Sequence, residues 1–424
     1  MTEAQAAPGG VIDILDLHDP VLSDLQRAAL ANTVVPPLEE EAVLEQARKA
    51  TGLSDFGEPD FRERLRLWLK CAADDEQLSN VGKAGVYGLA VRAATNRLYV
   101  EDLVRRHPQI LDLPIDRPLA IAGLPRSGTT HLQNFLAADP QLRSLPYWEA
   151  IRPFAAADEI AKPGETDPRW LKCAAEWERA DAMMPISKAM HPFDPEHISE
   201  DIELQNLNFS SYHIEFISGR SPVWRDYYFA HDQAPTYRYM KKVLQALDFT
   251  TGGGRRWLLK CPQHMEQLKA FNSVFPDATL VINHRDPVAS IQSAITGNCY
   301  RARLRRTVVQ PDETAEYWID RYERLLRACV RDRDTIASDQ AMDVYFHELM
   351  ADPMTQVEAI YRKAGLLIDA ALRERWRAFM ADNPRGKHGQ VRYDLRRDFG
   401  LTPEEIRARF QFYMDRFPVR VEVR

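Results

Sequence analysis

The sequence predicts an α/β protein: a parallel sheet flanked by helices, preceded by a helical extension and interrupted by a helical insertion. Short apolar runs of strand length alternate with stretches at helical spacing, which is typical of a parallel sheet covered on both faces. The 424 residues exceed what one compact core usually serves. We therefore expect a flexible N-terminus over 1–20, a helical extension over 21–115, and an α/β domain over 116–424 with its helical insertion at 150–250.

The extension is predicted to contain three helices. An apolar stripe at helical spacing begins after Pro36 and ends at Gly52, a residue type that often closes a helix. Asp60 is a candidate cap for a second helix. A third helical run stops at His107 and Pro108, because the residue before a proline disfavours helical backbone.

Four apolar runs are predicted to form the buried sheet. They are RPLAIAGLP (117–125), RWLLK (256–260), ATLVINH (278–284) and MDVYF (342–346). A long amphipathic helix through Tyr317 and Leu326 is expected before the fourth run. The TGGGRR stretch precedes a strand and does not follow one, so we expect a turn there and not a phosphate cradle.

Composition excludes several classes of protein. The net charge of −7 argues against a general nucleic-acid binder. The five cysteines are scattered without C-x-x-C or C-x-x-H spacing, so neither a disulfide framework nor a zinc site is expected. The N-terminus lacks a basic start and an apolar run, and no segment is apolar over the length of a bilayer. We therefore expect a cytoplasmic protein without a membrane span.

The stretch GLPRSGTTHL (123–132) resembles a phosphate-binding loop without its lysine. Gly123 and Gly128 keep the glycine spacing of G-x-x-x-x-G-K-[ST], and Thr130 keeps the final hydroxyl, but Thr129 replaces the lysine. A predicted strand precedes the loop and a predicted helix follows it. Loop amides and the helix N-terminus then converge on one spot, which favours an anion.

The residues at the strand ends disfavour an ordinary kinase or NTPase. Such enzymes use the missing lysine on the β- and γ-phosphates and hold magnesium with a strand-end carboxylate. Here RWLLK ends in Lys260, and ATLVINH is followed by Arg285. We therefore expect side-chain cations and no metal to stabilise the anion. A metal-dependent P-loop enzyme and a non-catalytic nucleotide-binding module remain as alternatives.

Two motifs carry a family resemblance. GLPRSGTTHL resembles the phosphosulfate-binding loop of sulfotransferases that use 3′-phosphoadenosine 5′-phosphosulfate (PAPS). NHRDPVASIQS resembles the second motif of that superfamily, an arginine at a strand end (Arg285) with a serine eight residues later (Ser293). The wider pattern, from about residue 40 to 415, is similar to a bacterial sulfotransferase family through TGLSDFG, RHPQILDLPIDRPLAIAG, LLKCPQH and KHGQVRYDLRRDFGL.

The resemblance implies a sulfotransferase fold of the P-loop type and transfer of a sulfuryl group from PAPS to a hydroxyl or amine acceptor. It also implies that Arg285 and Ser293 bind the 3′-phosphate, with Arg385 and Lys387 completing that site. Arg126 stands where relatives place a lysine and is suited to charge stabilisation. The implied phosphosulfate ligands are Arg126, Ser127, Gly128, Thr129 and Thr130.

The catalytic base has two candidates. Lys260 and His264 lie in LLKCPQH, the region where relatives place a lysine and a histidine base, although the interval here is four residues and not two. A carboxylate, Glu200 or Asp201, is the alternative. The alternative to a catalytic role is a structural one, in which Ser199 caps a helix that starts at these residues.

The small-molecule acceptor is predicted to be apolar or aromatic. Residues 180–240 are rich in side chains that suit either an acceptor pocket or an ordinary core. Arginines 301, 303, 305 and 306 suit either attraction of an acidic acceptor or a solvated helix face. The apolar set is Met183, Met184, Phe193, Phe209, Tyr212, Phe216, Trp224, Tyr227, Tyr228 and Phe229.

Overall fold

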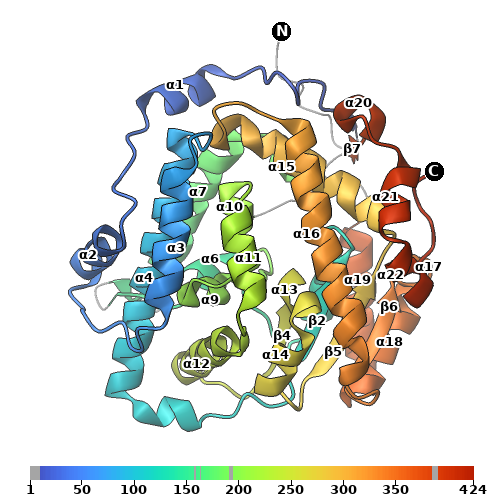
Figure 1. Cartoon of the computed structure of the whole chain (residues 1–424). Coiled ribbons are helices and arrows are strands. Elements are labelled where there is room, and N and C mark those ends of the chain that lie inside the picture. The colour runs from blue at the N-terminus through green and yellow to red at the C-terminus, as the bar shows by residue number, and fades with distance from the viewer. Residues whose placement is uncertain (1–9, 157–158, 163, 191–193, 384–389) are drawn as a thin grey trace.

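A computed structural model of the chain has a five-stranded parallel sheet in the order β3-β4-β2-β5-β6, and its labelled strands lie at the lower right of Figure 1. The structure describes residues 10–156, 159–162, 164–190, 194–383 and 390–424. The four longer strands confirm the four predicted runs, whereas the short edge strand β3 was not predicted. The sheet contains β2 (Leu119–Gly123), β3 (Leu142–Arg143), β4 (Arg256–Lys260), β5 (Thr279–His284) and β6 (Ala341–Tyr345).

The two faces of the sheet pack against different helices, because successive side chains of a strand point to opposite faces. Ala120 and Ile121 are neighbours in β2 and belong to separate cores. The core of Ala120 includes residues of α12, α14 and α16, and the core of Ile121 includes residues of α5, α18 and α19. These helices are α5 (Thr129–Ala137), α12 (Ala234–Thr251), α14 (Leu268–Val274), α16 (Pro311–Asp332), α18 (Pro353–Ala364) and α19 (Ala370–Asp382).

Residues 21–115 are helical, but they form four α-helices and a short 3-10 helix where three helices were predicted, and the first of them, over 24–32, was not predicted. Gly52 closes the second helix in a left-handed conformation, φ 71°. Asp60 occupies the N-cap position of the third helix, but its side chain pairs with Arg64 and caps nothing, so that prediction is wrong. The helices of the extension are α1 (Asp24–Asn32), α2 (Glu40–Thr51), α3 (Phe61–Asp74), α4 (Asn80–Arg106) and the short η1 (Pro108–Asp112).

The insertion between β3 and β4 is helical and shares a core with the extension. Trp68 of α3 and Trp224 of α11 are buried in one cluster with Phe209, which joins the two regions. The insertion contains α6 (Tyr147–Ile151), α7 (Pro168–Met183), α8 (Ser187–Met190), α9 (Ile202–Gln205), η3 (Asn206–Asn208), α10 (Tyr212–Ser218), α11 (Pro222–Ala230) and α12. The remaining helices are α13 (Pro262–Glu266), α15 (Pro287–Arg305), η4 (Arg333–Thr335), α17 (Phe346–Ala351), α20 (Leu395–Phe399), α21 (Pro403–Arg409) and α22 (Gln411–Arg416).

The described part of the N-terminal segment, residues 10–20, corrects the expectation of flexibility there. Strand β1 (Val11–Asp13) pairs in parallel with β7 (Gln390–Arg392), and Ile14 and Leu17 are buried in the main core. Figure 1 shows this segment running across the molecule to lie beside α20 and β7, so it meets a part of the chain that is distant in sequence. The apolar run that forms β1 is too short for the sequence alone to predict that it pairs with β7.

None of the helices within the described residues combines the length and the apolar character that crossing a bilayer requires.

Candidate active site

The loop between β2 and α5 has the conformation that its glycine spacing predicts. Gly128 has φ 91°, and a Cβ atom there would come within 2.7 Å of the Phe346 ring. Only glycine therefore fits without a shift. The Ser127 hydroxyl donates to the Leu124 carbonyl, and the Asn283 amide donates to the Ser127 carbonyl at 2.6 Å. The loop is thus held from β5, with the first amides of α5 left without helical partners.

Arg126 connects the two sequence motifs. Its backbone is left-handed, φ 68°, which is uncommon for a residue with a side chain and marks a constrained position. Its Nε atom donates to the Ser293 hydroxyl at 3.0 Å, and that hydroxyl donates to the Tyr393 hydroxyl at 2.8 Å. The structure therefore brings Arg126 and Ser293 together, as the predicted site requires.

Arg285 lies against the loop but is already engaged. One of its terminal nitrogens donates to the Arg126 carbonyl at 2.7 Å, and its guanidinium stacks on Phe346 at 4.0 Å. Its other donors form a two-point ion pair with Glu422 at 2.8 and 2.7 Å. Asp286 caps α15 as predicted and also accepts from the Glu422 backbone, which holds this C-terminal segment in place.

Lys260 is buried at the end of β4, with 1% of its side chain exposed. Its ammonium donates to the Glu200 carboxylate at 2.5 Å and to the Thr130 hydroxyl at 3.4 Å. Burial and the charge of Lys260 lower the pKa of His197 to about 4, so this imidazole is neutral at pH 7. Lys260 thus links the start of α5 to a carboxylate of the insertion.

Asp201 braces Lys260 through the backbone. Its carboxylate accepts from the Lys260 amide at 2.9 Å, and its own amide donates to the Lys260 carbonyl. Burial alone would raise the pKa of Asp201, but the adjacent His264 and a hydrogen bond from Gln205 lower it below its usual value. Ser199 does not cap the helix that follows; its hydroxyl donates to the Glu200 carbonyl, so the capping prediction is wrong.

His264 is completely buried. Its Nδ1 atom lies 3.1 Å from the Tyr237 hydroxyl, its Nε2 atom lies 3.1 Å from the Asp201 carboxylate, and its ring packs on Phe271. This histidine supports Asp201 from the core side and does not line the cavity described next. The sequence predicted His264 as a candidate base, whereas the structure encloses its side chain in the core, away from the cavity.

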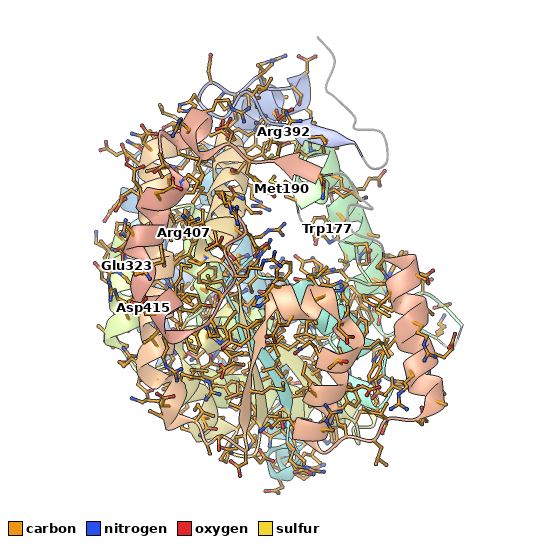
Figure 2. The ribbon with its side chains drawn as sticks, turned by 90° about the vertical axis from the view of Figure 1, so that its right-hand side faces the viewer. Trp177, Met190, Glu323, Arg392, Arg407 and Asp415 are labelled. Carbon is orange, nitrogen blue, oxygen red and sulfur yellow. The ribbon has the colours of Figure 1, made fainter. Side chains whose placement is uncertain are left out.

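A cavity of about 1070 Å³ opens beside the loop. It extends from Arg126 and Ser293 between α4, α7, α10 and α15, and Glu200 lines it where it meets Lys260. One wall is the face of α4 that carries Gly82, Gly85 and Gly88. We call this space the cavity, and we call the loop 124–130 with Lys260 and Arg285 the loop end. Figure 2 shows two further lining residues, Trp177 and Met190, below Arg392 of β7.

The predicted apolar set divides between the cavity and the core. Four members line the cavity: Met183, Met184, Tyr212 and Phe216. The other described members form the core shared by the extension and the insertion: Phe209, Trp224, Tyr227, Tyr228 and Phe229. Phe193 lies outside the described residues.

The four arginines at the C-terminal end of α15 do not form a solvated helix face. Arg301 and Arg305 line the cavity. Arg303 pairs with Asp16 of the N-terminal segment, and Arg306 pairs with Asp75. The solvated reading is therefore wrong for this stretch.

The structure does not describe two of the predicted phosphate ligands, and it adds four site residues that the sequence analysis did not predict. Arg385 and Lys387 lie outside the described residues. Across the part of the chain that is described, no group of three histidine, cysteine or acidic side chains is arranged to hold a metal ion. His197, Asn283, Tyr393 and Glu422 were not predicted as site residues. Asn283 and Tyr393 lie within the quoted stretches NHRDPVASIQS and KHGQVRYDLRRDFGL, but their contacts with Ser127 and Ser293 depend on tertiary packing.

A family model described as "Sulfotransferase family" matches residues 118–370, which include β2, the loop, Lys260 and the start of α15. The chain belongs to this sulfotransferase family. The omega-hydroxy-beta-dihydromenaquinone-9 sulfotransferase Stf3 from Mycobacterium tuberculosis, and that from Mycobacterium bovis, are 24% identical to it over 282 residues, covering 63% of this chain and 68% of the relative.

Solved sulfotransferase structures share the whole architecture. STF9 from Mycobacterium avium is 28% identical with a TM-score of 0.79, and the match covers 93% of this chain and 99% of STF9. STF1 from Mycobacterium tuberculosis is 26% identical with a TM-score of 0.76, covering 89% of this chain and 99% of STF1. The helical extension and insertion therefore recur in other sulfotransferases.

Proposed function

We propose that this sulfotransferase moves the sulfuryl group of PAPS to a hydroxyl of a small acceptor held in the cavity. The observation that carries the proposal is the position of Lys260. Its ammonium touches Thr130 at the start of α5 and Glu200 on the cavity wall. One cation therefore stands between an anion-binding helix start and a carboxylate that faces the acceptor space.

The residues of the loop end suit a nucleotide with a phosphosulfate group. The Gly128 conformation opens the backbone to a close anion, and Arg126 and Lys260 supply positive charge on two sides of the helix start. Arg285 and Ser293 remain the proposed 3′-phosphate ligands, with Arg385 and Lys387 as further ones. On transfer, a bond forms from acceptor oxygen to sulfur while the bond from sulfur to the bridging phosphate oxygen breaks, and the nucleotide leaves with the electron pair.

Glu200 is the base that the geometry favours. It lines the cavity, whereas His264 is enclosed by Tyr237, Asp201 and Phe271. We infer that Glu200 accepts the hydroxyl proton while Lys260 and Arg126 stabilise the charge that develops on the departing phosphate. His264 and Asp201 position this pair through the Lys260 backbone.

Cations at the strand ends support a reaction without a bound metal. The ends of β4 and β5 deliver Lys260 and Arg285, and Asp286, the carboxylate that follows β5 in the sequence, is used as a helix cap. A kinase or NTPase would need that carboxylate for magnesium. The relative named an omega-hydroxy-beta-dihydromenaquinone-9 sulfotransferase further supports a hydroxyl acceptor with a large apolar body.

Ligand-dependent thermal stability tests the donor class. The nucleotide product 3′-phosphoadenosine 5′-phosphate (PAP) should raise the unfolding temperature more than ATP with magnesium does, because at equal concentration the ligand that binds the folded state more tightly stabilises it more. Preference for ATP with magnesium would support the kinase alternative. Binding of PAP without transfer from labelled PAPS to any hydroxyl probe would support the non-catalytic module.

A pair of variants tests the base. Glu200→Gln keeps a hydrogen-bond acceptor for Lys260 but cannot take a proton, so the single-turnover rate should fall about a hundredfold. His264→Asn should change that rate by less than about threefold in the folded protein, because His264 does not face the cavity. The reverse pattern would return the base to His264.

A further inference from the structure

One face of α15 runs from the loop end along the cavity. Ser293, Gly297, Arg301 and Arg305 follow one another at intervals of four residues, and all four line the cavity. At 1.5 Å per residue, Arg301 lies about 12 Å and Arg305 about 18 Å along the helix from Ser293. Two cations therefore stand in the cavity well beyond the loop end.

The carboxylates of the cavity lining are already paired. Each one among the described residues has a basic partner at ion-pair distance. The pairs are Glu159 with Lys172, Glu176 with Arg152, Asp181 with Lys188, Glu200 with Lys260, and Glu203 with Arg92. The lining also contains Arg169, which pairs with Asp167.

Three cavity cations form no ion pair within the described residues: Arg126, Arg301 and Arg305. Arg126 serves the loop end through Ser293. Arg301 and Arg305 pack against the Phe216 ring at 5.1 and 5.0 Å, and Arg305 also donates to the Phe216 carbonyl at 2.6 Å. Neither interaction supplies a negative charge.

The surroundings of these two arginines oppose their charge. Burial and the charge of Arg126 lower the pKa of Arg301 to about 10. Burial and the charge of Arg301 lower the pKa of Arg305 to about 9. Both guanidiniums are still charged at pH 7. A partly buried cation without a partner costs free energy, which an anionic ligand group would recover.

We propose that the acceptor is an elongated, amphipathic hydroxy acid whose anionic group is bound by Arg301 and Arg305. Its hydroxyl lies beside Glu200, and its apolar body lies along α4 and α10. The placement of the hydroxyl rests on the proposed function. A planar guanidinium matches a carboxylate with two hydrogen bonds, so a carboxylic acid is the group tested first.

The alternative is that Arg301 and Arg305 bind the donor. The two readings differ in which ligand loses affinity when the charge is removed. Arg301→Met is the primary variant, because within the described residues the Arg301 side chain, unlike that of Arg305, donates no hydrogen bond to a backbone carbonyl. Arg179→Met is the matched control: Arg179 is an exposed residue on α7, which borders the cavity, but does not line it.

The experiment compares ω-hydroxylauric acid with its methyl ester, by calorimetric titration into protein saturated with PAP. The unaltered protein should bind the acid about tenfold more tightly than the ester. Arg301→Met should bring this ratio close to one without changing PAP affinity, and Arg179→Met should leave the ratio unchanged. Equal binding of acid and ester by the unaltered protein would overturn the inference.

The inference would also be overturned if Arg301→Met bound PAP more weakly while the ratio of acid affinity to ester affinity stayed unchanged. That result would mean that Arg301 binds the donor. The titration needs no turnover, so its outcome is separate from that of the proposed function. Failure of sulfuryl transfer with a preserved acid preference would reject the reaction and keep the anion site. Transfer to both probes at equal efficiency and affinity would keep the reaction and reject the anion site.

Discussion

The loop end and the cavity differ in how their charges are treated. At the loop end, the side chains hold one another: Arg126 binds Ser293, Arg285 binds Glu422, and Lys260 binds Glu200. In the cavity, Arg301 and Arg305 have no carboxylate partner within the described residues. The cations of the loop end are therefore already bound by other residues of the protein, whereas we propose that a ligand supplies the negative charge for Arg301 and Arg305.

Under the proposed function, this difference corresponds to two tasks, donor binding at the loop end and acceptor binding in the cavity. A donor that is the same in every turnover can be bound by side chains whose positions are fixed before it arrives. Such preorganised groups lower the activation barrier of the reaction by stabilising the charge that develops in the transition state. Recognition of one acceptor among many depends on groups that are costly to leave unpaired. Four predictions test this division.

The largest effect is expected where the two regions meet. Lys260→Met removes the cation between Thr130 and Glu200, so the single-turnover rate should fall about a hundredfold to a thousandfold. Rapid-quench measurement with saturating labelled PAPS would report this rate. Affinity for the hydroxy-acid probe should change far less, and a rate within threefold of the unaltered enzyme would contradict the central place given to Lys260.

A pair of glycine substitutions should separate the regions. Gly128→Ala forces a side chain into a left-handed backbone against Phe346, which also supports Arg285, so PAP affinity should fall about tenfold or more. Gly85→Ala has no atom within 4 Å of its new Cβ and should leave PAP affinity unchanged. Calorimetric titration of both variants would show whether the loop end can be damaged alone, and equal losses would break the comparison.

His264→Asn should chiefly affect stability. The change opens space beside Phe271 and weakens the support of Asp201, which costs about 1 to 3 kcal/mol of unfolding free energy. Urea unfolding would measure this cost. Urea midpoints that match the unaltered protein would contradict the positioning role.

The smallest effect is expected at the C-terminal segment. Glu422→Gln removes the charge that occupies Arg285, so PAP affinity should rise a few-fold if the 3′-phosphate uses the same guanidinium. Glu404→Gln is a control, because that residue is exposed and pairs with Arg407. A decrease in PAP affinity would mean that Glu422 orients Arg285 for the ligand.

The sequence predicted most of the loop end, because its residues lie in short contiguous motifs. Strand, loop and helix follow one another from Leu119 to Ala137, and parallel strands deliver their ends to one edge of the sheet. Lys260 and Arg285 could therefore be placed near Gly128 without any knowledge of side-chain contacts. The cap at Asp286 was equally local.

What the sequence could not predict depends on distant segments. Glu422 reaches Arg285 from the other end of the chain, and β1 pairs with β7 across 379 positions of sequence, as Val11 opposite Gln390. The burial of His264 follows from α12 and α14 closing over it. The sequence therefore could not choose between His264 and Glu200 as the proposed base, because only tertiary packing shows which of the two side chains faces the cavity.

The glycine face of α4 allows the size of the cavity to be changed by single substitutions. Gly85 and Gly88 have free space where a side chain would begin, whereas at Gly82 a side chain would collide with the Arg305 carbonyl. Successively larger residues at these two positions would narrow the cavity in steps, and with it the space that we propose for the acceptor, without changing the loop end. A lineage could in this way acquire new substrates without rebuilding its catalytic machinery.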